Sequence, residues 1–131
     1  KTNENPVYYI QYAHARISSI LKKARKSKYS IKKFDKSLLY MLDANEELSL
    51  IKKMVNLNDL LENIAESREP HKLATYTHEL AGLFHKYYSN STIIDDENKD
   101  LTQCRLYLIW SVKCVLAICL ELMGISAPEK M

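Results

Sequence analysis

Apolar residues recur at intervals of three and four along most of this chain, which is the spacing of one face of an α-helix. The pattern predicts a first helix over 5–24, with Pro6 in its first turn. Further helices are expected over 35–42, over 45–64 as one or two segments, over 70–88 and over 100–123. The apolar stripe of the first helix consists of Ile10, Ala13, Ile17, Ile20, Leu21 and Ala24.

The last segment, 100–123, is apolar on all sides and could be mistaken for a membrane-spanning helix. Lys113 stands at its middle, however, where a charged side chain costs roughly 3 kcal/mol in a bilayer. We therefore expect a central helix surrounded by the others, and no membrane partner. Gly124 is placed to end this helix as its C-cap, and Pro128 prevents a restart.

Composition supports a helical protein. Two glycines and three prolines are few for 131 residues, and hairpins need such turn residues. We expect an all-α helical bundle that forms one domain over 1–131. Cys104, Cys114 and Cys119 lie in one predicted helix without Cys-x-x-Cys spacing, which favours packed thiols in a reduced, cytoplasmic compartment.

The formal net charge of +3 is distributed unevenly. Basic residues crowd the stretch 22–36 around a single acid, Asp35, whereas acidic residues dominate 43–69. A run of this kind is either a solvated surface or a patch that binds an anionic partner. Charge alone leaves both interpretations open.

The sequence contains no recognisable catalytic or metal motif. His78-Glu79 begins like a zinc-protease helix, but Gly82 stands where the second histidine is needed. His71, His78 and His85 lie two helical turns apart, roughly 10 Å, which is too far for one zinc ion. We expect these histidines to face solvent or a partner, and we expect no catalytic, cofactor-binding or metal site.

One face of the first helix carries chemistry that a core does not need. Tyr8, Tyr12, Arg16 and Lys23 project about a quarter to a third of a turn from the apolar stripe. Tyrosine rings can stack on unpaired bases, and arginine can bind a phosphate or a base edge. The alternative is that the tyrosines fill the rim of the core and Arg16 caps a neighbouring helix. Residue spacing does not decide between the two.

Three segments carry a resemblance to a known family. They read Asn-Pro-Val-Tyr-Tyr-Ile-Gln-Tyr-Ala-His-Ala-Arg-Ile over 5–17, Ala-Gly-Leu-Phe-His-Lys-Tyr-Tyr over 81–88, and Leu-Met-Gly-Ile-Ser-Ala-Pro-Glu-Lys-Met over 122–131. The chain resembles the C-terminal anticodon-binding domain of bacterial-type arginyl-tRNA synthetase, a class I aminoacyl-tRNA synthetase. Residues 25–69 match that family only as a helical pattern.

The resemblance implies binding of the anticodon stem-loop of arginine tRNA. Tyr12 and Arg16 would face the loop, Tyr88 would serve the middle anticodon base, a cytosine, and Met131 would lie near the loop. Lys23 would hold RNA by charge, as part of the basic run. We expect no DNA partner.

The resemblance also implies a longer, cytoplasmic parent protein. That parent, an arginine–tRNA ligase, would use ATP and Mg to join arginine to tRNA on a catalytic domain absent here. Residues 5–24 would be the junction helix from that domain. The enzyme class therefore belongs to the parent, and the piece in hand would do no chemistry.

The sequence departs from the family at several positions. Tyr87 replaces the usual Phe and Ser89 the usual Asn, which we expect to alter hydrogen bonding beside the base pocket. Lys130 replaces Arg, which removes a bidentate contact. The alternative function is a helical protein–protein interaction bundle that uses the tyrosine face and the acidic stretch 43–69.

Overall fold

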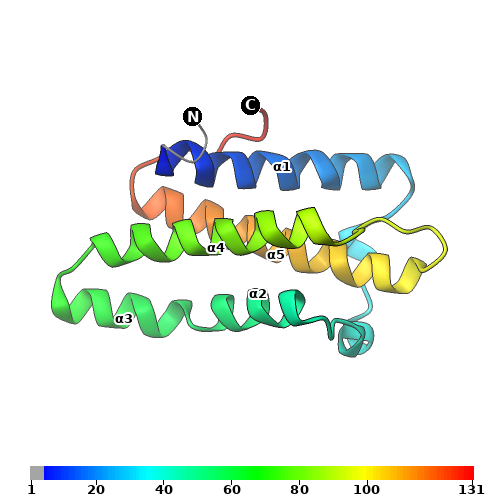
Figure 1. The fold of residues 1–131 in the computed structure, drawn as a ribbon, viewed down its shortest axis with the longest axis horizontal. Helices are drawn as coiled ribbons and strands as arrows, with labels where there is room; N and C mark the ends of the chain where they lie inside the picture. The colour runs from blue at the N-terminus through cyan, green and yellow to red at the C-terminus, as the bar shows by residue number, and fades with distance from the viewer. Residues whose placement is uncertain (1–4) are drawn as a thin grey trace.

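The computed structural model describes residues 5–131, except for the side chain of Lys33 (Figure 1). The start of the predicted domain, residues 1–4, lies outside the described residues. Within them the chain forms helices and no strand, so the all-α prediction is confirmed. The elements are α1 Pro6–Lys26, the 3₁₀ helices η1 Ile31–Lys33 and η2 Lys36–Met41, α2 Asn45–Val55, α3 Leu57–Ser67, α4 His71–Asn90 and α5 Lys99–Leu122.

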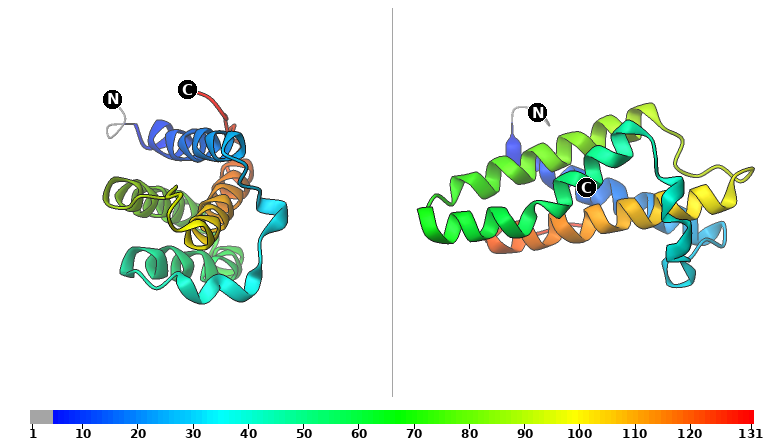
Figure 2. Two further views of the ribbon diagram at one scale, coloured as in Figure 1. Left: turned by 90° about the vertical axis from the view of Figure 1, so that its right-hand side faces the viewer. Right: turned by 90° about the horizontal axis from the view of Figure 1, so that it is seen from below.

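The bundle has four long helical segments. Three are the single helices α1, α4 and α5, and the fourth is formed by α2 followed by α3. In Figure 1, α4 runs across the middle of the molecule with α1 above it and α2–α3 below it, and α5 passes behind it. The end-on view in Figure 2 shows α5 packed against the side of this stack. Helix α4 contacts α1, α2, α3 and α5, and α5 contacts α1, α2, α4, η1 and η2.

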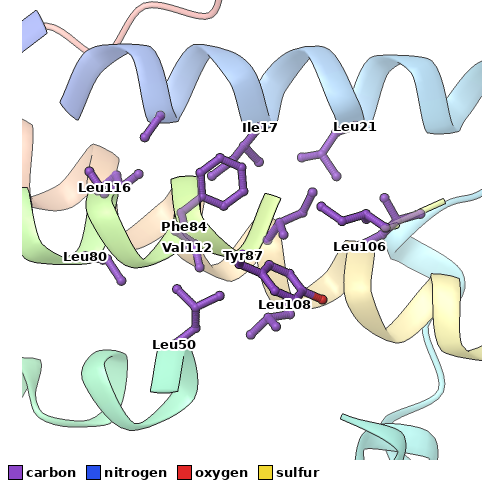
Figure 3. Packing of buried hydrophobic residues seen from close by; sticks show 14 of the residues in the cluster. Ile17, Leu21, Leu50, Leu80, Phe84, Tyr87, Leu106, Leu108, Val112 and Leu116 are labelled. Carbon is purple, nitrogen blue, oxygen red and sulfur yellow. The ribbon is translucent and has the colours of Figure 1, made fainter. Parts of the chain in front are cut away.

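The core lies where α1, α2, α4 and α5 meet. Figure 3 shows Ile17 pointing down from α1 and Leu50 pointing up from α2, toward Phe84 and Leu80 of α4. These four side chains are 0% exposed. Burying each such side chain contributes about 1.5–3 kcal/mol. The apolar stripe read from the sequence therefore forms the inner face of α1.

The ends of α1 follow its sequence signals. Asn5 caps the helix, because its Oδ1 accepts hydrogen bonds from the N–H groups of Val7 at 3.0 Å and Tyr8 at 3.1 Å. Pro6 occupies the first turn, where its missing N–H costs nothing. The helix ends at Lys26, and Lys28 turns the chain with a φ of 69°. The predicted start of this helix is confirmed, and the helix continues two residues beyond the predicted end at 24.

The middle segments differ from the prediction in detail. The segment 45–64 is two helices, α2 and α3, which break at Asn56. Asn45 is of a residue type that commonly caps helices, but Ala44 occupies the N-cap position of α2. The N–H of Ala44 donates to the Glu47 carboxylate at 3.2 Å. The predicted helix over 35–42 is the 3₁₀ helix η2, capped by Asp35.

Helix α5 is central but is not surrounded on every side. Its inner residues are buried, whereas Trp110 is 36% exposed and Ile118 is 48% exposed on the outer side. The expectation of a helix covered on all sides is therefore wrong for this outer face. No helix among residues 5–131 is long and apolar enough to cross a membrane.

Candidate nucleic-acid interface

Helices α1 and α4 bring three of the predicted binding residues together. The Cζ of Arg16, on α1, lies 4.6 Å from the ring centroid of Tyr12 and 4.5 Å from that of Tyr88, on α4. Distances of this size give cation–π attraction between a guanidinium and each ring. Arg16 thus links a tyrosine on its own helix to a tyrosine far away in the sequence.

Tyr8 extends this arrangement by one more ring. It stacks on Tyr12 with ring centroids 6.2 Å apart and an interplanar angle of 30°. We call the four side chains Tyr8, Tyr12, Arg16 and Tyr88 the aromatic column. Tyr8 is 36% exposed and Tyr88 is 41% exposed, so both tyrosines remain open to a further stacking partner.

His85 supplies the hydrogen-bond acceptor that holds Arg16. The Nη1 of Arg16 donates to the Nδ1 of His85 at 3.2 Å, and its Nη2 donates to the hydroxyl of Tyr12 at 2.8 Å. Because arginine only donates, Nδ1 must be the unprotonated ring nitrogen. Nε2 then carries the proton and donates to the backbone oxygen of Tyr9 at 3.4 Å.

The surroundings of His85 favour its neutral form. Burial lowers the pKa of the imidazole, and the Arg16 guanidinium lowers it further, while the hydrogen bond to the Tyr9 carbonyl opposes them. The ring is neutral at pH 7 as a result. That protonation state is the one in which Nδ1 can accept from Arg16.

A shallow pocket beside Tyr88 also contains Lys23. Its volume is about 410 Å³, and Ser89, Ser91 and Thr92 add hydroxyl groups to its wall. Ile20, Ile93 and Ile94 complete the lining. Hydroxyl groups, apolar side chains and one cation together suit a flat, polar-edged ligand beside a phosphate. The structure therefore brings Lys23 and Tyr88, predicted separately, to one site.

The predicted basic run is an exposed surface on the last turns of α1 and the segment after it. Its described side chains are all exposed, and none forms an ion pair with a described carboxylate. These cations are Lys22, Lys23, Arg25, Lys26, Lys28, Lys32 and Lys36. Lys33 belongs to the run, but its side chain lies outside the described part of the chain.

The C-terminal tail packs along another side of α1. The Nδ1–H of His14 donates to the carbonyl of Pro128 at 2.7 Å, and the Nε2 of Gln11 donates to the carbonyl of Ser126 at 3.0 Å. At about 100° per residue, both side chains point well away from Tyr12. Met131 follows this anchored segment and is 52% exposed, so the structure does not join it to the aromatic column.

Sequence reasoning missed two functions of histidine here. His14 is 3% exposed and holds the tail, although its place in the 5–17 motif was the available signal. His78 and His85 pack against the ring of Tyr9, with centroids 4.9 Å and 4.7 Å apart. The prediction is that the histidines face solvent or a partner. His71 is exposed, whereas His78 and His85 are half-buried against Tyr9 and are therefore not fully open to solvent.

Tyr87, a departure from the family pattern, belongs to the core and not to the base pocket. It is 0% exposed, and its hydroxyl donates to the buried carboxylate of Glu47 at 2.7 Å. Burial raises the pKa of this phenol, and the neighbouring Glu47 raises it further. The hydroxyl that replaces a phenylalanine edge therefore has a partner inside the bundle.

No group of three or more potential metal ligands occurs among residues 5–131. Gly82 lies within α4 and Gly124 follows α5, so neither belongs to a phosphate-binding loop.

Known proteins that are similar to this chain belong to one family. A family model described as the DALR anticodon binding domain matches residues 10–131. The chain is 46% identical, over its full length, to the arginine–tRNA ligase of Citrifermentans bemidjiense and covers 24% of that protein. It is 41% identical to the arginine–tRNA ligase of Listeria welshimeri, over 99% of this chain and 23% of that protein. The chain thus spans about a quarter of the length of these relatives.

Two solved structures share the fold. The Campylobacter jejuni protein assigned as an arginyl-tRNA synthetase superposes with a TM-score of 0.85 at 34% identity, over 97% of this chain and 27% of that one. Thermus thermophilus arginyl-tRNA synthetase gives a TM-score of 0.76 at 34% identity, over 94% of this chain and 21% of that one. The resemblance to the anticodon-binding domain of arginyl-tRNA synthetase is therefore confirmed, and the chain belongs to the DALR anticodon binding domain family.

Proposed function

We propose that this chain binds the anticodon stem-loop of an arginine tRNA. The observation that carries the proposal is the aromatic column, which presents two open tyrosine rings next to a basic surface whose described side chains have no carboxylate partner. Exposed rings stack on splayed bases, and exposed lysines neutralise phosphates. The family and the printed names of the relatives support the same partner.

Each part of the site has a distinct task in this proposal. Tyr88 stacks on the middle anticodon base, and Lys23 binds a phosphate beside the same pocket. Arg16 uses two of its five N–H donors within the protein and keeps the others for a base edge or phosphate. The basic run holds the stem. Met131 reaches the loop from the end of the tail.

The chain acts as the tRNA-binding domain of a longer arginine–tRNA ligase. In this proposal residues 1–131 form one domain, and 5–24 is the helix that joins it to a catalytic domain. ATP and Mg would be bound on that other domain, which would lie in the part of the longer protein that this chain does not cover. This domain positions the tRNA, in the cytoplasm, and the ligation takes place elsewhere in the protein.

The test measures the dissociation constant of the chain for the arginine anticodon stem-loop and for the same RNA with its middle base changed. The unaltered chain should bind the first RNA more tightly, and the affinity should fall as salt rises. Tyr88→Ala should cost about 1–3 kcal/mol, because one stacking ring is lost.

Tyr40→Ala is the matched control for Tyr88→Ala. Tyr40 is 75% exposed on η2 and lies outside the aromatic column. It should bind RNA like the unaltered chain. If neither the middle base nor Tyr88→Ala changes the affinity, the anticodon role is wrong and the interaction-bundle alternative returns.

A further inference from the structure

We propose, on the basis of the function proposed above, that His85 is a positioning residue which holds Arg16 against both Tyr12 and Tyr88 before RNA arrives. The aromatic column is then a preformed surface. Its assembly depends on a side chain that need not touch RNA itself.

The contacts of Arg16 carry this inference. Arginine has a long side chain and loses considerable rotamer freedom when it is fixed. Here both terminal nitrogens are bonded, Nη2 to the Tyr12 hydroxyl at 2.8 Å and Nη1 to the His85 Nδ1 at 3.2 Å. The two bonds fix the plane of the guanidinium between partners on α1 and α4. Without the His85 bond, the remaining side-chain hydrogen bond of Arg16 would be to its own helix, and only the cation–π contact with Tyr88 would link it to α4.

His85 is itself held in one orientation. Its Nε2 donates to the Tyr9 backbone oxygen at 3.4 Å, and its ring packs against those of Tyr9 and Tyr12 with centroids 4.7 Å and 5.6 Å apart. Phe84, on the same helix, covers another side of the imidazole, with the two ring centroids 5.7 Å apart. The imidazole therefore presents Nδ1 to Arg16 in a fixed direction, as an aligned acceptor should.

The hydrogen bond that holds Arg16 depends on the charge of His85. The titratable and charged groups around the ring are Arg16, Tyr9 and Tyr12 from α1, with His78 of α4 on the other side of Tyr9. Burial and Arg16 keep the pKa of His85 below its usual value of about 6.5. Protonation would turn Nδ1 into a donor and place a second cation beside the guanidinium, so Arg16 would be released as the pH falls.

The experiment compares four proteins: the unaltered chain, His85→Leu, His85→Gln and the control His71→Gln. His71 lies on the same helix but is exposed and away from the column. At about pH 7.5, His85→Leu should bind the arginine anticodon stem-loop about 2- to 10-fold more weakly, the cost of ordering one free side chain on binding. His85→Gln should bind normally, because its amide can accept from Arg16 and donate to Tyr9.

The pH profile separates positioning from simple packing. As the pH falls through the pKa of His85, which lies below the ordinary histidine value of about 6.5, the unaltered chain and His71→Gln should lose affinity relative to His85→Gln. Glutamine does not titrate, so His85→Gln should keep its hold on Arg16 throughout. A His85→Gln profile that declines like that of the unaltered chain would overturn the proposal.

A measurement on the free protein keeps this inference separate from the function it rests on. The Arg16 side-chain N–H resonance in an NMR spectrum should be shifted by the adjacent rings in the unaltered chain and in His85→Gln. It should move toward a free-arginine position in His85→Leu. Unchanged Arg16 signals in His85→Leu would refute the positioning role even if the RNA binds as proposed. If the unaltered chain does not distinguish the two stem-loops, the proposed anticodon function is refuted, but the positioning role of His85 is not.

Discussion

Glu47 shows how much a single buried residue contributes to this bundle. Its carboxylate is 1% exposed and accepts hydrogen bonds from the Ala44 N–H at 3.2 Å, the Tyr87 hydroxyl at 2.7 Å and the Arg105 Nε at 2.8 Å. It thereby joins the start of α2 to α4 and α5 next to the loop after α4. Burying a carboxylate is costly unless partners of this kind surround it.

Glu47→Ala should lower the free energy of unfolding by about 3–5 kcal/mol, because it leaves Arg105 and the Tyr87 hydroxyl without their acceptor. Urea denaturation followed by circular dichroism measures the change. Glu46→Ala is the control, since Glu46 bonds to Asn90 at the surface and should cost no more than about 1 kcal/mol. If the free energy of unfolding falls equally in the two variants, the buried carboxylate contributes no more to stability than that of Glu46.

At the scale of elements, the end of α5 decides where the tail goes. Gly124 has a φ of 73°, its N–H donates to the Glu121 carbonyl at 2.9 Å, and the Ile125 N–H donates to the Leu120 carbonyl at 2.9 Å. This pair of bonds is the Schellman motif, which favours glycine. The C-cap predicted at Gly124 is confirmed, and it turns the chain toward its bonds with Gln11 and His14.

Replacing each of the two glycines by alanine should change the stability of the chain in opposite directions. Gly124→Ala should destabilise the chain by about 1–2 kcal/mol, because its left-handed backbone conformation strains any Cβ even though no atom lies within 4 Å. Gly82 lies inside α4, and its new Cβ would meet only the Tyr9 hydroxyl, at an ordinary 3.6 Å. Gly82→Ala should stabilise the helix by about 0.5–1 kcal/mol. Thermal unfolding of both variants measures the signs, and a stabilising Gly124→Ala would contradict the cap.

Also at the scale of elements, pairs of side chains on α1 and α4 combine to form the candidate site. Tyr12 and Arg16 are four residues apart on α1, and His85 and Tyr88 are three apart on α4, so each pair shares one helix face. When the helices pack, the two pairs meet as one cluster. The Tyr12–Arg16 pair was visible in the sequence, but its meeting with His85 and Tyr88 was not.

At the scale of the whole molecule, the charge distribution governs binding to a polyanion. The net charge of +3 is modest, yet the basic run is exposed and its described members lack carboxylate partners. Such a surface attracts RNA over a distance of about one Debye length, about 10 Å at 0.1 M salt. Affinity for the anticodon stem-loop should therefore depend steeply on salt.

Lys26→Gln should weaken binding to every stem-loop tested, whatever the middle base, and should reduce the slope of log affinity against log salt by about 1. A titration at several salt concentrations measures both effects. Lys52→Gln is the control, because Lys52 is an exposed lysine on α2, outside the basic run. If the two variants change the slope equally, the run has no special part in binding.

The sequence by itself determined the helices, most of their ends and the residue types of the site. These follow from local causes: apolar spacing along 5–24, the Asn5 cap and the left-handed Gly124. The resemblance added Tyr88, which no periodic pattern would have selected.

Only the tertiary structure decided how those parts function together. Arg16 and His85 are 69 positions apart, and His14 and Pro128 are 114 apart, so nothing local relates them. Their contacts arise because the buried faces of α1, α4 and α5 pack in one register, which sets the side chains at the rim. The same packing half-buried His78 and His85 against Tyr9 and left one side of α5 uncovered, because a side chain is buried only where the faces of two helices meet.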